Sequence, residues 1–157
     1  MQITIDNLED SGLSEKIISI INYVSSMFIE DHSNMVIEVD FRQDLPFDGH
    51  ATVDPSDEDD DNPLNFELLF KTSLLQDQDS FLLTLVHEMI HIKQFALNEL
   101  RNYPNSIKYN GKFYRLRSGR IEQDKYRFYP WEIEAYGNEE MILEEWKKNF
   151  KKHIDRV

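Results

Sequence analysis

Cysteine is absent from the 157-residue chain. Its absence excludes disulfide bonds, zinc sites built on thiolates and catalysis by a cysteine nucleophile. Any metal ion would therefore have to be held by histidine and carboxylate side chains. Long hydrophobic runs are missing as well: no stretch of about 18 apolar residues occurs, so we expect no membrane span.

The N-terminus lacks the basic and then apolar leader of a secreted protein, and Asp6, Glu9 and Asp10 come early instead. We therefore expect no signal peptide and a cytoplasmic protein. The chain is 40% hydrophobic and 12% aromatic, which is typical of a globular protein. Its length predicts one domain that spans residues 1–157.

Basic residues are scarce in the first part of the chain. Residues 1–92 contain 3 basic and 20 acidic side chains, and residues 93–157 contain 14 basic and 10 acidic ones, which gives the net charge of −13. Such acidity argues against a general nucleic-acid binder. The segment Arg101–Arg127 differs, because its 8 basic and 2 acidic residues are interleaved with aromatic ones. This basic loop and hairpin is either a solvated surface or a contact for phosphate or an acidic peptide.

One stretch, HEMIH at residues 87–91, contains side chains that could bind a metal ion and transfer a proton. His87 and His91 lie about 40° apart around a helix, so both imidazoles can reach one metal ion. Zinc binds such neutral nitrogens, and a catalytic zinc keeps a position open for water. Glu88 would lie beside that position and could take the proton of the water. The flanking residues are apolar almost all round, which predicts a buried helix. A pair of hydrogen-bonded core histidines is the alternative.

A zinc site needs a third protein ligand. One large group uses a histidine six residues after the second, but Leu97 occupies that position, and His153 lies in the charged tail. A carboxylate on the helix predicted from Pro130 to Phe150 is the remaining option. Helical geometry favours Glu132, because Glu134 points about 160° away from it. Glu132 shares its face with Tyr136, Glu139, Leu143, Trp146 and Phe150. A salt-bridged carboxylate at the helix start is the alternative reading of Glu132.

The two motifs together resemble the gluzincin group of zinc metallopeptidases, which carry H-E-x-x-H on one helix and E-x-x-A on the next. Residues 87–91 and 132–135 match residue by residue. The chain looks like the minimal members of that group, including small metallopeptidase-like proteins of phages and bacteria. The resemblance covers mainly residues 79–145. It departs from the group at Tyr136, where relatives often carry an aspartate that orients a ligand histidine. That orienting partner must then come from elsewhere.

The resemblance implies peptide-bond hydrolysis with one zinc ion per chain. His87, His91 and Glu132 would hold the metal, and Glu88 would act as the base and then as the proton donor. A strand before the metal helix would pair with an extended substrate peptide, and residues 64–70 occupy that place.

A donor for the transition-state oxyanion is also needed. The candidates are an arginine or one of five tyrosines: Tyr109, Tyr114, Tyr126, Tyr129 and Tyr136. Two other functions stay open. One is a processing enzyme with a single dedicated protein target. The other is a non-catalytic or DNA-associated binding module on the same fold.

The remaining segments predict an α+β, zincin-like domain, with a small sheet beside the metal helix and the glutamate helix. A helix is expected from Ser14, as its N-cap, to Ile29. The metal helix should be capped by Asp79 or Ser80. Strands are expected at 37–41, 51–53 and 64–70, and a hairpin with an Asn-Gly turn at 108–114. The acidic loop 54–63 should be solvated, with weak calcium binding as the alternative, and His50 a surface or capping residue.

Overall fold

The computed structural model describes residues 1–116 and 123–154. Within these residues the chain folds into helices and two sheets, which confirms the predicted α+β class. The α-helices are α1 (Ser11–Phe28), α2 (Gln78–Ala96) and α3 (Pro130–Ile154). One sheet contains β1 (Gln2–Asp6), β2 (Val36–Arg42), β3 (Gly49–Val53) and β4 (Asn65–Lys71), and the other contains β5 (Leu100–Tyr103), β6 (Ser106–Tyr109) and β7 (Lys112–Arg115). Short 3-10 helices are η1 (Pro55–Asp57), η2 (Thr72–Gln76) and η4 (Gln123–Phe128).

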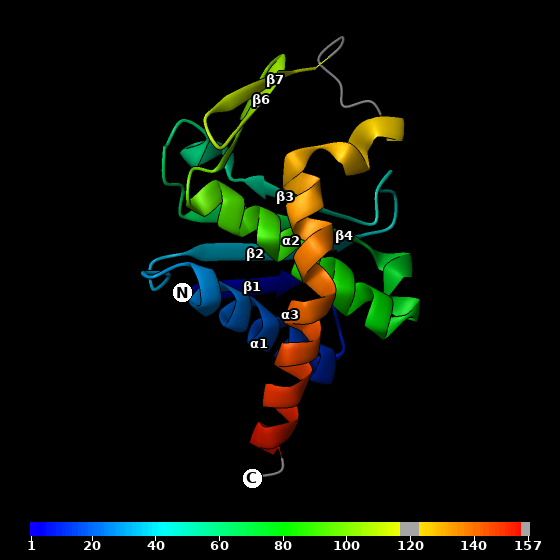
Figure 1. Cartoon of the computed structure of the whole chain (residues 1–157). Helices are drawn as coiled ribbons and strands as arrows, with labels where there is room; N and C mark the ends of the chain where they lie inside the picture. The colour runs from blue at the N-terminus through cyan, green and yellow to red at the C-terminus, as the bar shows by residue number, and fades with distance from the viewer. Residues whose placement is uncertain (117–122, 155–157) are drawn as a thin grey trace.

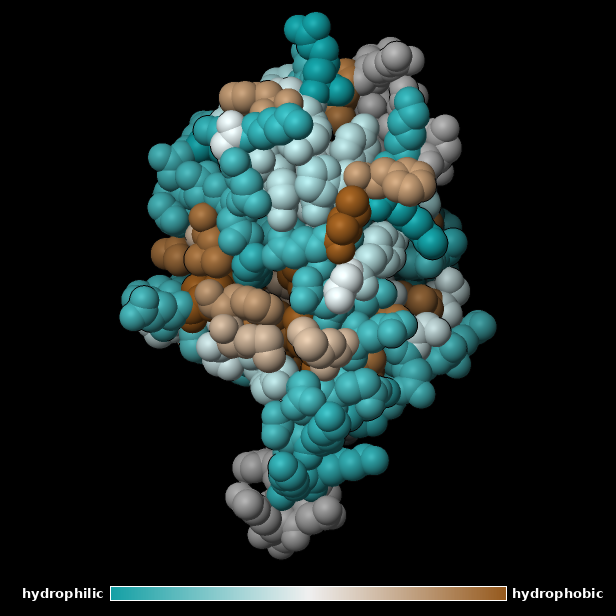
Figure 2. All heavy atoms as spheres, in the orientation of Figure 1, coloured by the Kyte–Doolittle hydropathy of each residue, from teal (hydrophilic) through white to brown (hydrophobic). Residues whose placement is uncertain are grey.

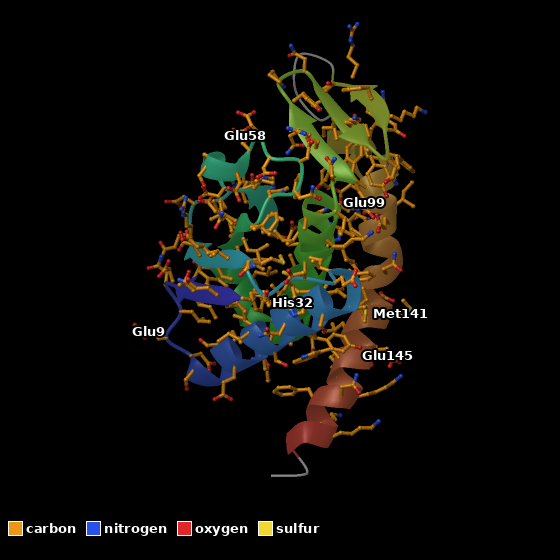
Figure 3. The ribbon with its side chains drawn as sticks, turned by 90° about the vertical axis from the view of Figure 1, so that its left-hand side faces the viewer. Glu9, His32, Glu58, Glu99, Met141 and Glu145 are labelled. Carbon is orange, nitrogen blue, oxygen red and sulfur yellow. The ribbon has the colours of Figure 1, made fainter. Side chains whose placement is uncertain are left out.

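The four-stranded sheet has the order β1-β2-β4-β3, with β1, β2 and β4 parallel and β3 antiparallel to β4. Burial alternates along β2 and β4, so one face of the sheet belongs to the core. The helices cover that face (Figure 1), and the side view shows α1 and α2 between the sheet and α3 (Figure 3). Helix α3 runs from beside the three-stranded sheet, past α2, to the opposite end of the molecule (Figure 1).

The edge of the sheet differs from the prediction. Residues 64–70 were expected to offer a free edge to a peptide, but β4 pairs with β2 on one side and with β3 on the other. That prediction is wrong, because both sides of β4 are already hydrogen-bonded. The strand with a free edge beside α2 is β3, which lies antiparallel to β4 and, within residues 1–116 and 123–154, pairs with no other strand.

Two helix starts also differ from the prediction. Helix α1 begins at Ser11, because the Asp10 carboxylate accepts a hydrogen bond from the Leu13 backbone N–H at 3.0 Å. Helix α2 is capped by Asp77, which binds the backbone N–H and the hydroxyl of Ser80. In both cases the capping residue is an aspartate that lies two or more residues before the predicted cap. Helix α2 is buried through most of its length, as predicted.

The hairpin between β6 and β7 is confirmed. Asn110 and Gly111 have φ angles of 46° and 81°, the two positive values that a type I′ turn requires. Strand β1 was not predicted; it pairs with β2 through a β1–α1–β2 crossover. Hydrophilic side chains cover most of the visible surface, with small hydrophobic groups between them (Figure 2). None of the helices in the described ranges combines the length and hydrophobicity needed to cross a membrane.

Gly49 lets the edge strand β3 approach α2 closely. A Cβ atom at this position would lie 2.8 Å from Thr84 Cγ2 and 3.1 Å from Glu88 Cγ. We expect Gly49→Ala to lower the free energy of unfolding by about 1–3 kcal/mol, the usual cost of overpacking. Urea denaturation measures it. Thr84→Ser removes the nearest methyl group, so adding it to Gly49→Ala should restore part of the stability. Thr84→Ser alone is the control, and a Gly49→Ala protein as stable as wild type would contradict this packing.

Candidate metal centre

Three predicted ligands from two helices meet in the core. His87 and His91 come from successive turns of α2, and Glu132 comes from the first turn of α3. Their exposed fractions are 5%, 6% and 1%. The Nε2 atoms of the two histidines are 3.2 Å apart, and each lies against one oxygen of Glu132, at 3.1 and 3.2 Å. The buried trio predicted from the two motifs is therefore present.

These separations fit a metal ion. Zinc bound tetrahedrally at about 2.0–2.1 Å holds neighbouring donor atoms about 3.3 Å apart. The histidine nitrogens and the carboxylate oxygens already lie within about 0.2 Å of that spacing. Within the described residues, His87, His91 and Glu132 form the one group of three side chains able to hold a metal ion. His50 is not part of it, and the His153 side chain lies outside the described residues.

Electrostatics shows what the trio does without a metal. Burial alone would lower the pKa of His91, but its hydrogen bond to Glu132 and the charges of Glu88 and Glu132 outweigh burial and raise it to about 9. Burial would raise the pKa of Glu132, but the two histidines lower it to about 2. Without a metal, protonated His91 therefore provides the positive charge that a metal cation would otherwise provide, and Glu132 stays ionised in the core.

His87 is oriented by a carboxylate that the family pattern does not predict. Its Nδ1 lies 2.7 Å from Oε2 of Glu139. Because a carboxylate only accepts, Nδ1 donates its proton there and Nε2 is left facing the trio. Tyr136, the position at which the resemblance led us to look for an orienting aspartate, packs its ring on His87 with centroids 4.5 Å apart. Glu139, two turns after Glu132, supplies the missing partner.

His91 is oriented by an amide. Its Nδ1 lies 2.8 Å from Oε1 of Gln94. The Gln94 amino group donates to the Trp131 carbonyl and to Glu134, so its oxygen must face His91. Glu134, which helical geometry placed away from Glu132, is half-buried and also binds Lys93. Glu134 therefore supports His91 through Gln94, whereas Met141 and Glu145 lie on the outer side of α3 (Figure 3).

Glu88 lies beside the trio without belonging to it. Its side chain is 5% exposed, and its carboxylate accepts a hydrogen bond from the backbone N–H of Ala51 on β3. Burial raises the pKa of Glu88, against the opposite effect of the neighbouring histidines. A buried carboxylate with a raised pKa is suited to taking and returning a proton.

A cleft of about 560 Å³ opens over these residues. Its walls are β3 on one side and η4 with α3 on the other. Of the five tyrosines considered as oxyanion donors, Tyr126 and Tyr136 line this cleft, and Tyr126 donates to Glu132. Tyr109 instead donates to Glu134, and Tyr114 and Tyr129 pack on Trp131. His50 is exposed on β3 and also lines the cleft.

The sequence reasoning did not assign roles to Glu139, Gln94 or Gly49. Two of them carried a usable signal: Glu139 shares the helix face of Glu132, and Gln94 is a polar residue in an otherwise apolar helix. Gly49 carried none, because its role depends on the distance between two elements.

No protein-family model, curated protein or solved structure matches the chain.

Glu139 gives the first prediction from the site. Glu139→Gln should weaken zinc binding roughly 10–100-fold, the usual effect of removing the partner of a ligand histidine. The cause is loss of the charged acceptor at Nδ1 of His87. A competition titration with a chromophoric chelator measures the affinity. Glu140→Gln removes the same charge from the exposed next position and should leave the affinity unchanged. Equal losses in both variants would assign the effect to net charge.

The raised pKa of His91 gives the second prediction. Because its pKa is about 9 in the metal-free protein, zinc must displace a proton, and zinc affinity should rise with pH up to that value. The expected slope is at least about tenfold per pH unit between about pH 7 and about pH 8.5, because the hydrogen bond to Glu132 and the charge of Glu88 raise the pKa of His87 as well, against the effect of burial. Calorimetry across that range measures it. An affinity independent of pH there would contradict the hydrogen-bonded, protonated state of His91.

Proposed function

We propose that this protein is a gluzincin-type zinc metallopeptidase that hydrolyses peptide bonds. The observation that carries the proposal is Glu88, a buried carboxylate beside the three-ligand group at the floor of an open cleft. Structural zinc sites are closed by four protein ligands, whereas catalytic sites combine three with an open position. The spacing of His87, His91 and Glu132 over two helices supports the family assignment.

When bound, zinc would polarise the substrate carbonyl and lower the pKa of a water molecule. Glu88 would take the proton of that water and pass it to the amine that leaves. The N–H of Ala51 keeps the Glu88 carboxylate turned toward β3. Glu139 and Gln94 would fix the two histidines so that neither ring has to turn during the reaction.

The free edge of β3 is the site that we propose for the substrate backbone. Asp48 and Asp54 bond to β4 through their backbone groups, so the alternation of an antiparallel pair turns those of Gly49, Ala51 and Val53 outward. The Ala51 N–H is bound to Glu88, which leaves the Ala51 carbonyl and the groups of Gly49 and Val53 for a peptide. A peptide that adds to this edge would lie along the cleft with its carbonyl groups above Glu88. This replaces β4, which has no free edge.

The two ends of the cleft differ in polarity. Beyond His91 the lining is mostly apolar and comes from α2, β5, β6 and α3, with Phe95, Leu100, Ile107 and Trp131 beside one polar residue, Asn102. Beyond His87 the lining includes Asp48 and Thr84. This asymmetry favours a peptide with a bulky apolar residue on one side of the scissile bond. Tyr136 is the donor that we propose for the oxyanion, because its side chain lines the cleft at Glu132, whereas Tyr126 already donates its hydroxyl proton to Glu132.

A non-catalytic module on the same fold would need the metal ligands but not Glu88. A buried carboxylate that does not hold the metal costs stability. Proton transfer gives a reason for its presence.

Replacement of Glu88 tests the proposal. Glu88→Gln keeps the shape and removes the proton acceptor, so hydrolysis should fall about 10²–10⁴-fold, while zinc binding stays within a few-fold of wild type. The substrate can be a mixture of peptides with randomised positions, with cleavage followed by mass spectrometry. Glu99→Gln changes a carboxylate outside the cleft, on the Lys93 side of α2, and serves as the control.

Cleavage by the zinc-loaded wild type should cluster beside bulky apolar residues. A Glu88→Gln protein that cuts as fast as wild type would refute the assigned base. Cleavage of one natural protein and of no library peptide would favour the dedicated processing enzyme over a general peptidase.

A further inference from the structure

The β5–β7 sheet has two chemically different faces. Its register places residues 101, 108 and 113 side by side in one row across the three strands. Residues 103, 106 and 115 form a second such row, two residues further along each strand. Because side chains alternate across a strand, these two rows share a face. We call it the outer face; it consists of Arg101, Tyr103, Ser106, Lys108, Phe113 and Arg115. The opposite face packs on Trp131 through Tyr109 and Tyr114.

The outer face combines cations with exposed rings. Phe113 is 59% and Tyr103 38% exposed, and their ring centroids are 5.7 Å apart. The Lys108 ammonium lies 5.6 Å from the Phe113 ring, and the Arg101 guanidinium lies 5.9 Å from the Tyr103 ring. No carboxylate belongs to the two rows. Figure 3 shows this sheet at the top of the molecule, beyond Glu99.

Charge sets this face apart from the rest of the protein. Residues 1–92 carry a net charge of −17, from 3 basic and 20 acidic residues. Arg101 is paired with Asp61 of the acidic loop. Among the described residues, Lys108 and Arg115 form no ion pair with a carboxylate. A polyanion would be repelled by most of the surface and attracted at the outer face. The basic segment first singled out, Arg101–Arg127, continues into residues 117–122, which lie outside the described residues.

Exposed rings beside cations fit a ligand with flat rings and negative charges. Bases stack on aromatic side chains, and phosphates pair with lysine and arginine. Three strands about 4.8 Å apart and four residues of about 3.3 Å each give a platform of roughly 10 by 13 Å, enough for about two bases. In a duplex the bases are already stacked on each other. An acidic peptide would use the cations and leave the rings without a partner.

We propose that the outer face binds single-stranded nucleic acid, with bases stacked on Tyr103 and Phe113 and phosphates paired with Lys108 and Arg115. The site is independent of the proposed peptidase activity, because the cleft is lined from the other face of the same sheet, by Leu100 and Ile107. Metal-free and metal-loaded protein should therefore bind equally.

Fluorescence anisotropy with a labelled oligothymidylate of about twelve nucleotides tests the proposal on the full chain. With two cations contacting phosphate, the logarithm of affinity should fall with the logarithm of salt concentration with a slope of about −1.4. Phe113→Ala should weaken binding roughly tenfold, as loss of a stacking ring does. Lys108→Ala should weaken it and make the salt slope shallower by about 0.7.

Two matched controls separate the outer face from the rest of the surface. Lys112 lies on the same hairpin but in a row of the opposite face, and Phe128 is 76% exposed on η4. Lys112→Ala and Phe128→Ala should bind as wild type does. Circular dichroism and zinc titration should be unchanged in all four variants.

Several results would overturn the proposal. One is the absence of binding at about 50 mM salt, where phosphate contacts are strong. Another is an equal loss of affinity in the control variants. A third is tighter binding of duplex DNA or polyglutamate than of the single strand. Tighter binding of polyglutamate would assign the face to an acidic protein instead.

Discussion

The structure depends on one buried ionic contact, the Glu132 carboxylate held between the imidazoles of His87 and His91. A lone carboxylate in the core would cost several kcal/mol or take up a proton. Here its pKa is instead held at about 2, because both histidines bind it. This contact joins α2 to α3 across a core that is otherwise almost wholly apolar. A divalent cation would satisfy the same three groups, which is why we interpret the contact as a metal site occupied by protons.

The rest of the site is arranged so that this contact has one geometry. Glu139 fixes His87, and Gln94, which is itself bound by Glu134 and the Trp131 carbonyl, fixes His91. Gly49 lets β3 lie against α2, which brings the Ala51 N–H to Glu88. The cleft thus has a rigid floor on α2 and a free strand edge along one side. The proposed peptidase activity depends on these parts, which come from segments far apart in the sequence.

The sequence predicted the parts of the site that depend on helical spacing. The spacing of four residues, which places two side chains on the same face of a helix, identified His87 and His91. The comparison of helix faces selected Glu132 over Glu134. Relations between elements could not be predicted in this way. Strand patterns alone do not reveal that β3 rather than β4 lies at the edge, because both alternate in a similar manner. Nor could spacing reveal that the partner of His87 is Glu139 or that Gly49 meets Thr84, since these contacts depend on how the elements pack. The helix caps were misplaced because several aspartates and serines lie near each helix start, and only the backbone conformation selects one.

The central claim is that His87, His91 and Glu132 form a metal site rather than a hydrogen-bonded cluster of the core. The most direct test is the metal content of the folded protein after reconstitution with zinc and removal of the excess, measured by mass spectrometry of the elements. The account predicts about one zinc per chain, the stoichiometry of such a motif. Folded protein that retains no zinc would contradict it, and the three side chains would then be a purely structural ionic contact.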